Sequence, residues 1–143
     1  MRNKRKSISL LGWIIGALLL IYLGVFCYLN LCKYAQHVDS DIAAEALLAR
    51  EIWVEKDITP NDWISSTERR IIGMPTVAAV FYGITGSMQT AAGITCVLLG
   101  AILLGTFYFF LRKLSLSRPA SITALLVLLS LIHISEPTRR RGI

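Results

Sequence analysis

The feature that most constrains this chain is an uncharged apolar run near its N-terminus, from Leu10 to Leu29. As an α-helix this run is about 30 Å long, which matches the hydrocarbon core of a bilayer. It is longer than the apolar part of a signal peptide, and no small-x-small cleavage site follows it. We therefore expect a retained transmembrane helix over residues 10–31.

A second uncharged run extends from Ile71 to Leu111 and is too long for one span. Glycine and proline interrupt its first half, and Ser87 is suited to cap the helix that follows. The sequence thus predicts a second transmembrane helix over residues 87–111, followed by a basic pair typical of a membrane interface. A third apolar run begins at Pro119, and proline suits the first turn of a helix.

Charge is distributed asymmetrically around these runs. The net charge is +6 and 55% of the residues are hydrophobic, which is unlike an ordinary soluble domain. Basic residues precede the first run, and three more lie in the segment 112–118, which has no acidic residue. The acidic residues before the tail lie between Asp39 and Glu68. The positive-inside rule places residues 1–9 and 112–118 in the cytoplasm and the loop 32–86 outside the plasma membrane. Orientation and lipid contact explain the basic residues, so no nucleic-acid partner is expected.

The C-terminal segment resembles translated laboratory DNA. Residues Leu129–Arg139, LSLIHISEPTR, match one reading frame of a common sequencing-library transposon adapter residue for residue. A match of this length is not expected by chance, so residues 129–143 are interpreted as an artefact. The authentic chain is then expected to break off near Leu128, inside a third span that begins at 119 (119–128). A genuine polar C-terminus after a third helix is the alternative.

The loop between the two long runs predicts short surface helices. A stretch rich in Ala, Leu and Glu predicts a helix at about 41–56, which Asp39, Ser40 or Asp41 can cap. We expect this helix to lie along the membrane surface and to pack against other parts of the protein. Its amphipathic pattern is moderate. Leu48 and Ile52 lie on one flanking face, and Leu47 and Val54 lie on another. Four of its apolar residues share one narrow face: Ile42, Ala46, Ala49 and Trp53.

Further short helices are predicted at about 66–72 and 75–84, separated by Gly73. The expected fold is therefore an all-α membrane protein. It has two complete transmembrane helices, a truncated third, and two or three short surface helices in the first outer loop. The three cysteines lack metal-site spacing and are interpreted as small apolar residues: Cys27, Cys32 and Cys96.

Two carboxylates separated by one residue, Asp39 and Asp41, form the first candidate site. In an extended backbone, residues two apart project to the same side and can share one divalent cation, for which Mg²⁺ or Mn²⁺ is suited. In a helix they diverge, so chelation requires Asp39 to lie before the helix begins. Helix capping is the commoner role of such residues. Their position just outside the first span favours a site that a lipid-linked phosphate can reach.

Together these features resemble multi-spanning membrane glycosyltransferases of the C-type fold. This class includes the dolichyl-phosphate-mannose protein mannosyltransferase-like and lipid A arabinosyltransferase-like enzymes. The resemblance covers residues 8–128 and rests on the first span, the outer DSD followed by AAEALLAREI, and a return span ending in RKL. The stretch DWISSTERRI, residues 62–71, is similar to a Trp-x-x-Ser-Thr-Glu-x-Arg pattern of bacterial members.

The resemblance implies transfer of a sugar from a polyprenyl-phosphate donor to an acceptor on the non-cytoplasmic face. It also implies an acidic residue of the first outer loop that acts as catalytic base or holds a metal near the phosphate. The matching positions are Asp39 and Asp41. We assign the base to Asp41 and a supporting role to Asp39, with both as possible ligands of a divalent cation.

The resemblance further matches Glu68 to the acid of the Ser-Thr-Glu stretch, and a capping-box pairing with Ser65 is the alternative. Arg69 and Arg70 are suited to bind a phosphate through bidentate hydrogen bonds, or else to face solvent and lipid head groups. His37 is interpreted as a polar residue at the interface. These residues complete the predicted substrate-binding set.

The later spans of such enzymes are missing here, so this fragment is expected to be inactive by itself. The rival interpretation is a small non-enzymatic membrane protein, such as a transporter subunit or an assembly factor. A polysaccharide polymerase or ligase is a third interpretation, because these also have many spans. Eight or so further spans encoded downstream would favour the transferase, and an early stop would favour the small protein.

Overall fold

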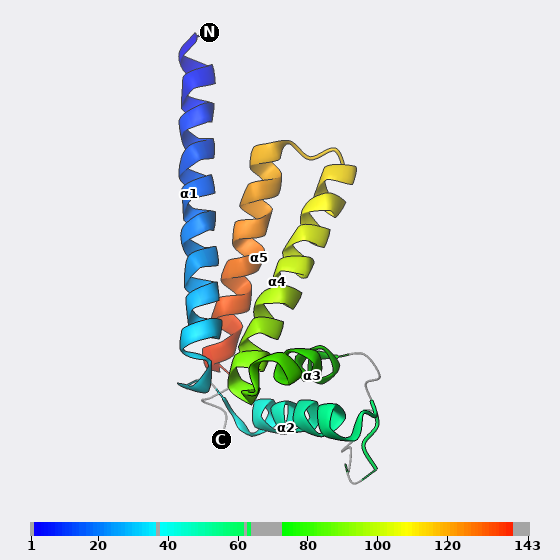
Figure 1. Ribbon diagram of the computed structural model, residues 1–143. Helices are drawn as coiled ribbons and strands as arrows, with labels where there is room; N and C mark the ends of the chain where they lie inside the picture. Colours follow the sequence, from blue (N-terminus) through cyan, green and yellow to red (C-terminus); the bar gives the residue numbers. More distant parts are fainter. Residues whose placement is uncertain (1, 37, 62, 64–72, 139–143) are drawn as a thin grey trace. The chain divides into compact units, whose positions relative to one another are not determined.

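The computed structural model describes residues 2–36, 38–61, 63 and 73–138 (Figure 1). In this part of the chain every regular element is a helix, which confirms the all-α class. The elements are α1 (Arg2–Cys32), the 3₁₀ helix η1 (Tyr34–Gln36), α2 (Ser40–Glu55), α3 (Met74–Thr85), α4 (Met88–Lys113) and α5 (Arg118–Thr138). The chain divides into two units, one of residues 27–100 and the other of residues 1–26 with 101–143.

Two helices are long and apolar enough to cross a membrane: residues Gly12–Cys32 of α1 and the whole of α4, Met88–Lys113. Their 21 and 26 residues correspond to about 31 and 39 Å of helix. Both lengths reach across a hydrocarbon core of about 30 Å. Helix α5 contributes a shorter apolar segment, Arg118–Leu131, among the residues whose side chains the structure describes.

The helices expected at about 41–56 and 75–84 correspond to α2 and α3, which run side by side in the unit of residues 27–100 (Figure 1). The helix expected at about 66–72 lies outside the described residues. Small side chains bring α2 and α3 together, since the buried cluster between them consists of Ala49, Ile52, Ala78 and Ala79. Short residues allow two helix backbones to approach closely and still fill the space between them.

The face of α2 that packs on α3 is wider than the predicted one, because it includes Ile52 as well as Ala49 and Trp53. Ile52, which the sequence places on a flanking face, is buried beside Ala49. Trp53, which the sequence places on the main face, remains 38% exposed. Its indole ring covers Gly83 of α3 so closely that a Cβ atom at that position would overlap the ring. The glycine, rather than an apolar pocket, therefore accommodates the tryptophan.

Helices α3 and α4 are joined by only two residues, Gly86 and Ser87. Gly86 ends α3 with a φ of 67°, a left-handed conformation that glycine adopts without strain, and its N–H donates to the Tyr82 carbonyl at 2.8 Å. Ser87 caps α4, as the sequence predicts, because its Oγ accepts the Thr90 N–H at 3.3 Å. This short link places the end of α3 next to the first turn of α4.

The first half of α4 contains several small buried residues, and one of them, Gly93, lies against the end of α1 within the same unit. Ala91, Ala92 and Thr95 are also buried, and the Thr95 hydroxyl donates to the Ala91 carbonyl at 2.8 Å. A Cβ atom at Gly93 would collide with the backbone carbonyl oxygen of Asn30. Close packing through small residues is the usual way in which helices associate inside membranes.

In the other unit, a tight turn joins α4 to α5. Ser115 adopts a φ of 60°, and two backbone hydrogen bonds close the helix end, from Ser115 to Arg112 at 3.1 Å and from Leu116 to Leu111 at 3.3 Å. This pattern is a Schellman motif with serine in the place that glycine usually takes. The Arg112 guanidinium also donates to the Leu116 carbonyl at 2.6 Å.

Candidate functional site

Asp39 and Asp41 lie at the start of α2, and both are exposed. Asp39 is the N-cap residue, with an extended backbone, and its Oδ1 accepts the Ile42 N–H at 2.9 Å. Asp41 follows inside the first helical turn. Asp39 thus lies before the helix, as it must if Asp39 and Asp41 are to bind one cation together. One of its carboxylate oxygens, however, already accepts the hydrogen bond that caps the helix. The capping role that the sequence offered as an alternative is confirmed for Asp39.

The structure brings Asp39 close to residues that the sequence did not single out. Tyr34 of η1 is partly buried, and its hydroxyl shares a hydrogen bond with the Cys96 thiol of α4. Burial raises the pKa of Tyr34 well above its usual range, and the neighbouring Cys96, Glu45 and Asp39 raise it further. The phenol therefore stays protonated and can donate a hydrogen bond at neutral and mildly alkaline pH.

This neighbourhood, which we call the Tyr34 cluster, consists of Tyr34, Asp39, Glu45 and Cys96. It joins η1, the first turns of α2 and the first half of α4 within one unit. The sequence treats Cys96 as a small apolar residue, whereas here it has a polar partner. Asp41 is not among the residues that act on Tyr34. No local sequence signal marks the pairing, since Tyr34 and Cys96 belong to different helices.

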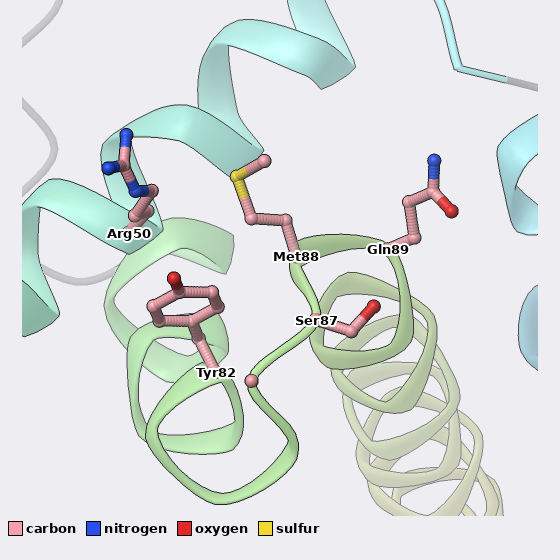
Figure 2. A pocket seen from close by; sticks show the side chains of 6 residues that line it. Arg50, Tyr82, Ser87, Met88 and Gln89 are labelled. Carbon is pink, nitrogen blue, oxygen red and sulfur yellow. The ribbon is translucent and has the colours of Figure 1, made fainter.

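A shallow open depression lies beside the link between α3 and α4. Figure 2 shows Arg50 of α2 and the Tyr82 hydroxyl on one side of it, and Ser87 and Gln89 on the other. Its volume is about 380 Å³, and its described lining contains one cation and no carboxylate. Arg50 also forms an exposed ion pair with Glu51, with Nη1 and Oε1 3.3 Å apart. An exposed ion pair of this kind contributes little free energy, so it is easily broken. Arg50 is therefore a cation that could turn to an anionic ligand.

Other residues of the predicted site fall outside the described part of the chain. These are Glu68, Arg69 and Arg70, together with Ser65 of the predicted capping box and His37. Within residues 2–36, 38–61, 63 and 73–138, no three His, Cys, Asp or Glu side chains gather closely enough to form a metal site. The divalent cation expected at Asp39 and Asp41 stays a prediction.

Over the residues that the structure describes, the regular elements are all helices, and two of them are long and apolar enough to cross a membrane. An acidic helix start lies shortly after the first of them, and a depression that contains Arg50 lies beside the start of the second. No protein-family model, curated protein or solved structure matches this chain. Its function is therefore argued from its own residues.

Proposed function

We propose that this chain is part of an integral membrane glycosyltransferase that moves a sugar from a polyprenyl-phosphate donor to an acceptor at the outer face of the plasma membrane. The observation that carries the proposal is the acidic start of α2, where Asp39 and Asp41 are exposed a few residues after the end of the apolar helix α1. If α1 spans the bilayer, these carboxylates lie near its boundary, where a donor that is anchored in lipid can reach them.

The proposed topology follows from charge. The basic N-terminus and the basic turn after α4 are cytoplasmic, so α1 and α4 cross in opposite directions. The acidic start of α2 and the depression beside Arg50 then face outward. The sugar donor reaches them from the membrane side, and the acceptor reaches them from the water.

In the proposed reaction Asp41 removes the proton from the acceptor hydroxyl. The acceptor oxygen then forms a bond to the anomeric carbon. The bond from that carbon to the phosphate oxygen breaks, and its electron pair stays on the polyprenyl phosphate. Asp39 is assigned a supporting role, because its Oδ1 is occupied by the Ile42 N–H.

The leaving phosphate needs positive charge beside it. Arg50 supplies a cation at the depression, and Arg69 and Arg70 are the further candidates from the sequence. A divalent cation such as Mg²⁺ fits a pair of carboxylates, because it binds through one or two of them plus substrate phosphate and water. If Asp39 and Asp41 held such a cation, it would stabilise the charge that develops on the phosphate. Asp41 would then be a ligand instead of the base, because a bound cation lowers the proton affinity of a carboxylate.

The second candidate is a non-enzymatic membrane protein, such as a transporter subunit or an assembly factor. The close contact of Gly93 with the Asn30 carbonyl favours tight helix association, which suits this function as well. Under this second proposal Asp39 acts as a helix cap alone, and Asp41 has no chemical role.

The test uses the protein encoded by the complete locus, reconstituted with a polyprenyl-phosphate sugar. Asp41→Asn is expected to abolish transfer while membrane insertion is unchanged. Asp39→Ser keeps a cap at the start of α2 but removes the carboxylate, so a loss of turnover separates chemistry from capping. Asp57→Asn is the matched control, because Asp57 is exposed and accepts the Thr59 N–H at 2.9 Å. Unchanged turnover in both Asp41→Asn and Asp39→Ser would refute the transferase and leave the second candidate.

A further inference from the structure

Helix α3 has an apolar face that α2 does not cover. Its covered side contains Ala78 and Ala79, which pack against α2. At 100° per residue, Val77, Val80 and Ile84 lie on the opposite side of the helix. Val80 is 55% exposed and Ile84 is 75% exposed. Exposure of large apolar side chains along one face of a helix is unfavourable in water, so such a face is expected to lie against lipid or protein.

The two packed helices differ sharply in charge. None of the twelve residues of α3 is charged. Helix α2 carries charged side chains spread along its sixteen residues: Asp41, Glu45, Arg50, Glu51 and Glu55. The pair therefore forms two layers, of which α2 is suited to water and α3 is not.

The short link between α3 and α4 indicates which apolar environment lies next to α3. Only Gly86 and Ser87 separate Thr85 from Met88, the first residue of α4, and two residues extend at most about 7 Å. Helix α4 has no charged residue before Arg112. If α4 crosses a bilayer, the end of α3 and its Ile84 side chain lie at the boundary of the same bilayer.

Trp53 and Lys56 mark the edge between the two layers. The Trp53 ring covers Gly83 of α3, and the Lys56 ammonium lies 3.2 Å from the centroid of the ring. An indole with an adjacent cation, partly exposed at the edge of an apolar face, is the combination that settles at the level of lipid head groups.

We propose that α3 lies in the interface of the bilayer, with the face of Val77, Val80 and Ile84 against lipid and with α2 above it on the water side. The inference rests on the membrane insertion of α4 that the proposed function includes, and it is independent of the transferase chemistry. It also revises the expected arrangement, in which the helix at 41–56 itself lies on the membrane surface. Interfacial helices bind through buried apolar area of this kind.

The test measures the depth of single labelled cysteines in vesicles of phosphatidylcholine and phosphatidylglycerol. Ile84→Cys and Val80→Cys are made in a chain whose three native cysteines are replaced by alanine, and each is labelled with an environment-sensitive fluorophore. Spin-labelled lipid should quench most of the fluorescence at both positions, and aqueous iodide should quench little of it. Val54→Cys, on the exposed part of α2 (58% exposed), should show the reverse.

Ile102→Cys separates the two proposals, because this residue lies within α4 and is 55% exposed. If lipid quenches position 102 but iodide quenches position 84, the interfacial placement of α3 is overturned and the membrane proposal stands. If neither quencher reaches position 84, protein covers the face, and the placement is overturned as well. If iodide quenches position 102, both proposals fail.

Because Cys96 shares a hydrogen bond with Tyr34, its replacement could disturb the fold. A second measurement therefore uses the unaltered chain and a lipid with a photoreactive group in its acyl chain near the head group. Mass spectrometry should find adducts on residues 77–84 and none on residues 44–55. Adducts on residues 44–55 with none on 77–84 would reverse the two layers and overturn the inference.

Discussion

The indole ring of Trp53 in α2 lies over Gly83 of α3 at a spacing that leaves no room for a Cβ atom. The Lys56 ammonium lies 3.2 Å from the centroid of the same ring. The ring is therefore held between a cation from the end of its own helix and the bare backbone of the neighbouring helix. This contact extends the small buried cluster of Ala49, Ile52, Ala78 and Ala79, so the α2–α3 pair depends on it.

Gly83→Ala is expected to destabilise the α2–α3 pair. Alanine gains about 1 kcal/mol over glycine within a helix, but forcing an extra methyl group into a packed contact costs about 1–3 kcal/mol. The overlap with the Trp53 ring should outweigh the gain. Unfolding of the chain in detergent, followed by circular dichroism, measures the difference.

Trp53→Leu supplies the control for this prediction. With the ring removed, Gly83→Ala should become neutral or stabilising, so the two changes should be strongly non-additive in a double-mutant cycle. Equal costs of Gly83→Ala in the presence and absence of Trp53 would show that the ring is not what excludes the Cβ atom.

Gly93→Ala is expected to cost more than Gly83→Ala. The atom that a Cβ at position 93 would meet is the backbone carbonyl oxygen of Asn30, which cannot rotate away as a side chain can. The loss should therefore be at the upper end of the 1–3 kcal/mol range for overpacking, or above it. The same unfolding measurement applies. Gly105→Ala is the matched control, because nothing lies within 4 Å of a Cβ atom there, and a similar loss in both variants would contradict the contact.

Asp39→Ala should fray the first turn of α2, because the Ile42 N–H loses its acceptor at 2.9 Å. Removal of an N-cap typically costs about 1 kcal/mol, whereas Asp39→Ser should be nearly neutral because serine caps comparably well. Hydrogen exchange of the Ile42 amide reports the effect directly. Faster exchange in Asp39→Ala with near-normal exchange in Asp39→Ser is the expected result, and equal exchange in all three chains would exclude the cap.

The Tyr34 cluster predicts a loss of stability in alkali. The pKa of Tyr34 is raised in the folded chain by burial, by Cys96 and by the carboxylates of Glu45 and Asp39. In the unfolded chain the phenol ionises near pH 10. The contribution of this group is therefore fully present below about pH 10 and is lost as the pH rises through the folded pKa, because the folded state retains a proton that the unfolded state has released.

Tyr34→Phe tests this prediction. The variant should lose less stability above pH 10 than the unaltered chain. It should also leave the amplitude of tyrosinate absorbance near pH 10 unchanged, because Tyr34 does not ionise there while the chain is folded. A drop in that amplitude would show that Tyr34 titrates in its usual range and that the cluster does not form.

The helix ends were predictable from sequence because their signals are local. Asp39 and Ser87 accept backbone N–H groups three residues ahead, and such caps depend on the residue and its immediate neighbours. The register of α2 was predicted less well. Its pattern is only moderately amphipathic. Ile52 of the flanking face is buried against α3, whereas Trp53 packs over Gly83 and is still 38% exposed.

The candidate site was predictable only where it coincides with a local motif. The Asp39-x-Asp41 spacing is visible in the sequence, but the pairing of Tyr34 with Cys96 joins residues of η1 and α4. The role of Arg50 likewise depends on how α2 packs beside the start of α4. Contacts of this kind depend on how the helices pack together. The composition and the periodicity of the sequence do not show which residues of different helices will meet.

The proposed adapter origin of residues Leu129–Arg139 makes a prediction about DNA. Reading the genomic locus past the codon of Leu128 should show a sequence that departs from LSLIHISEPTR and continues the third apolar run. The transferase proposal further expects roughly eight or more additional spans, each with a length and composition suited to a bilayer. A locus that encodes LSLIHISEPTRRRGI followed by a stop codon would overturn the adapter interpretation and would favour the small non-enzymatic membrane protein.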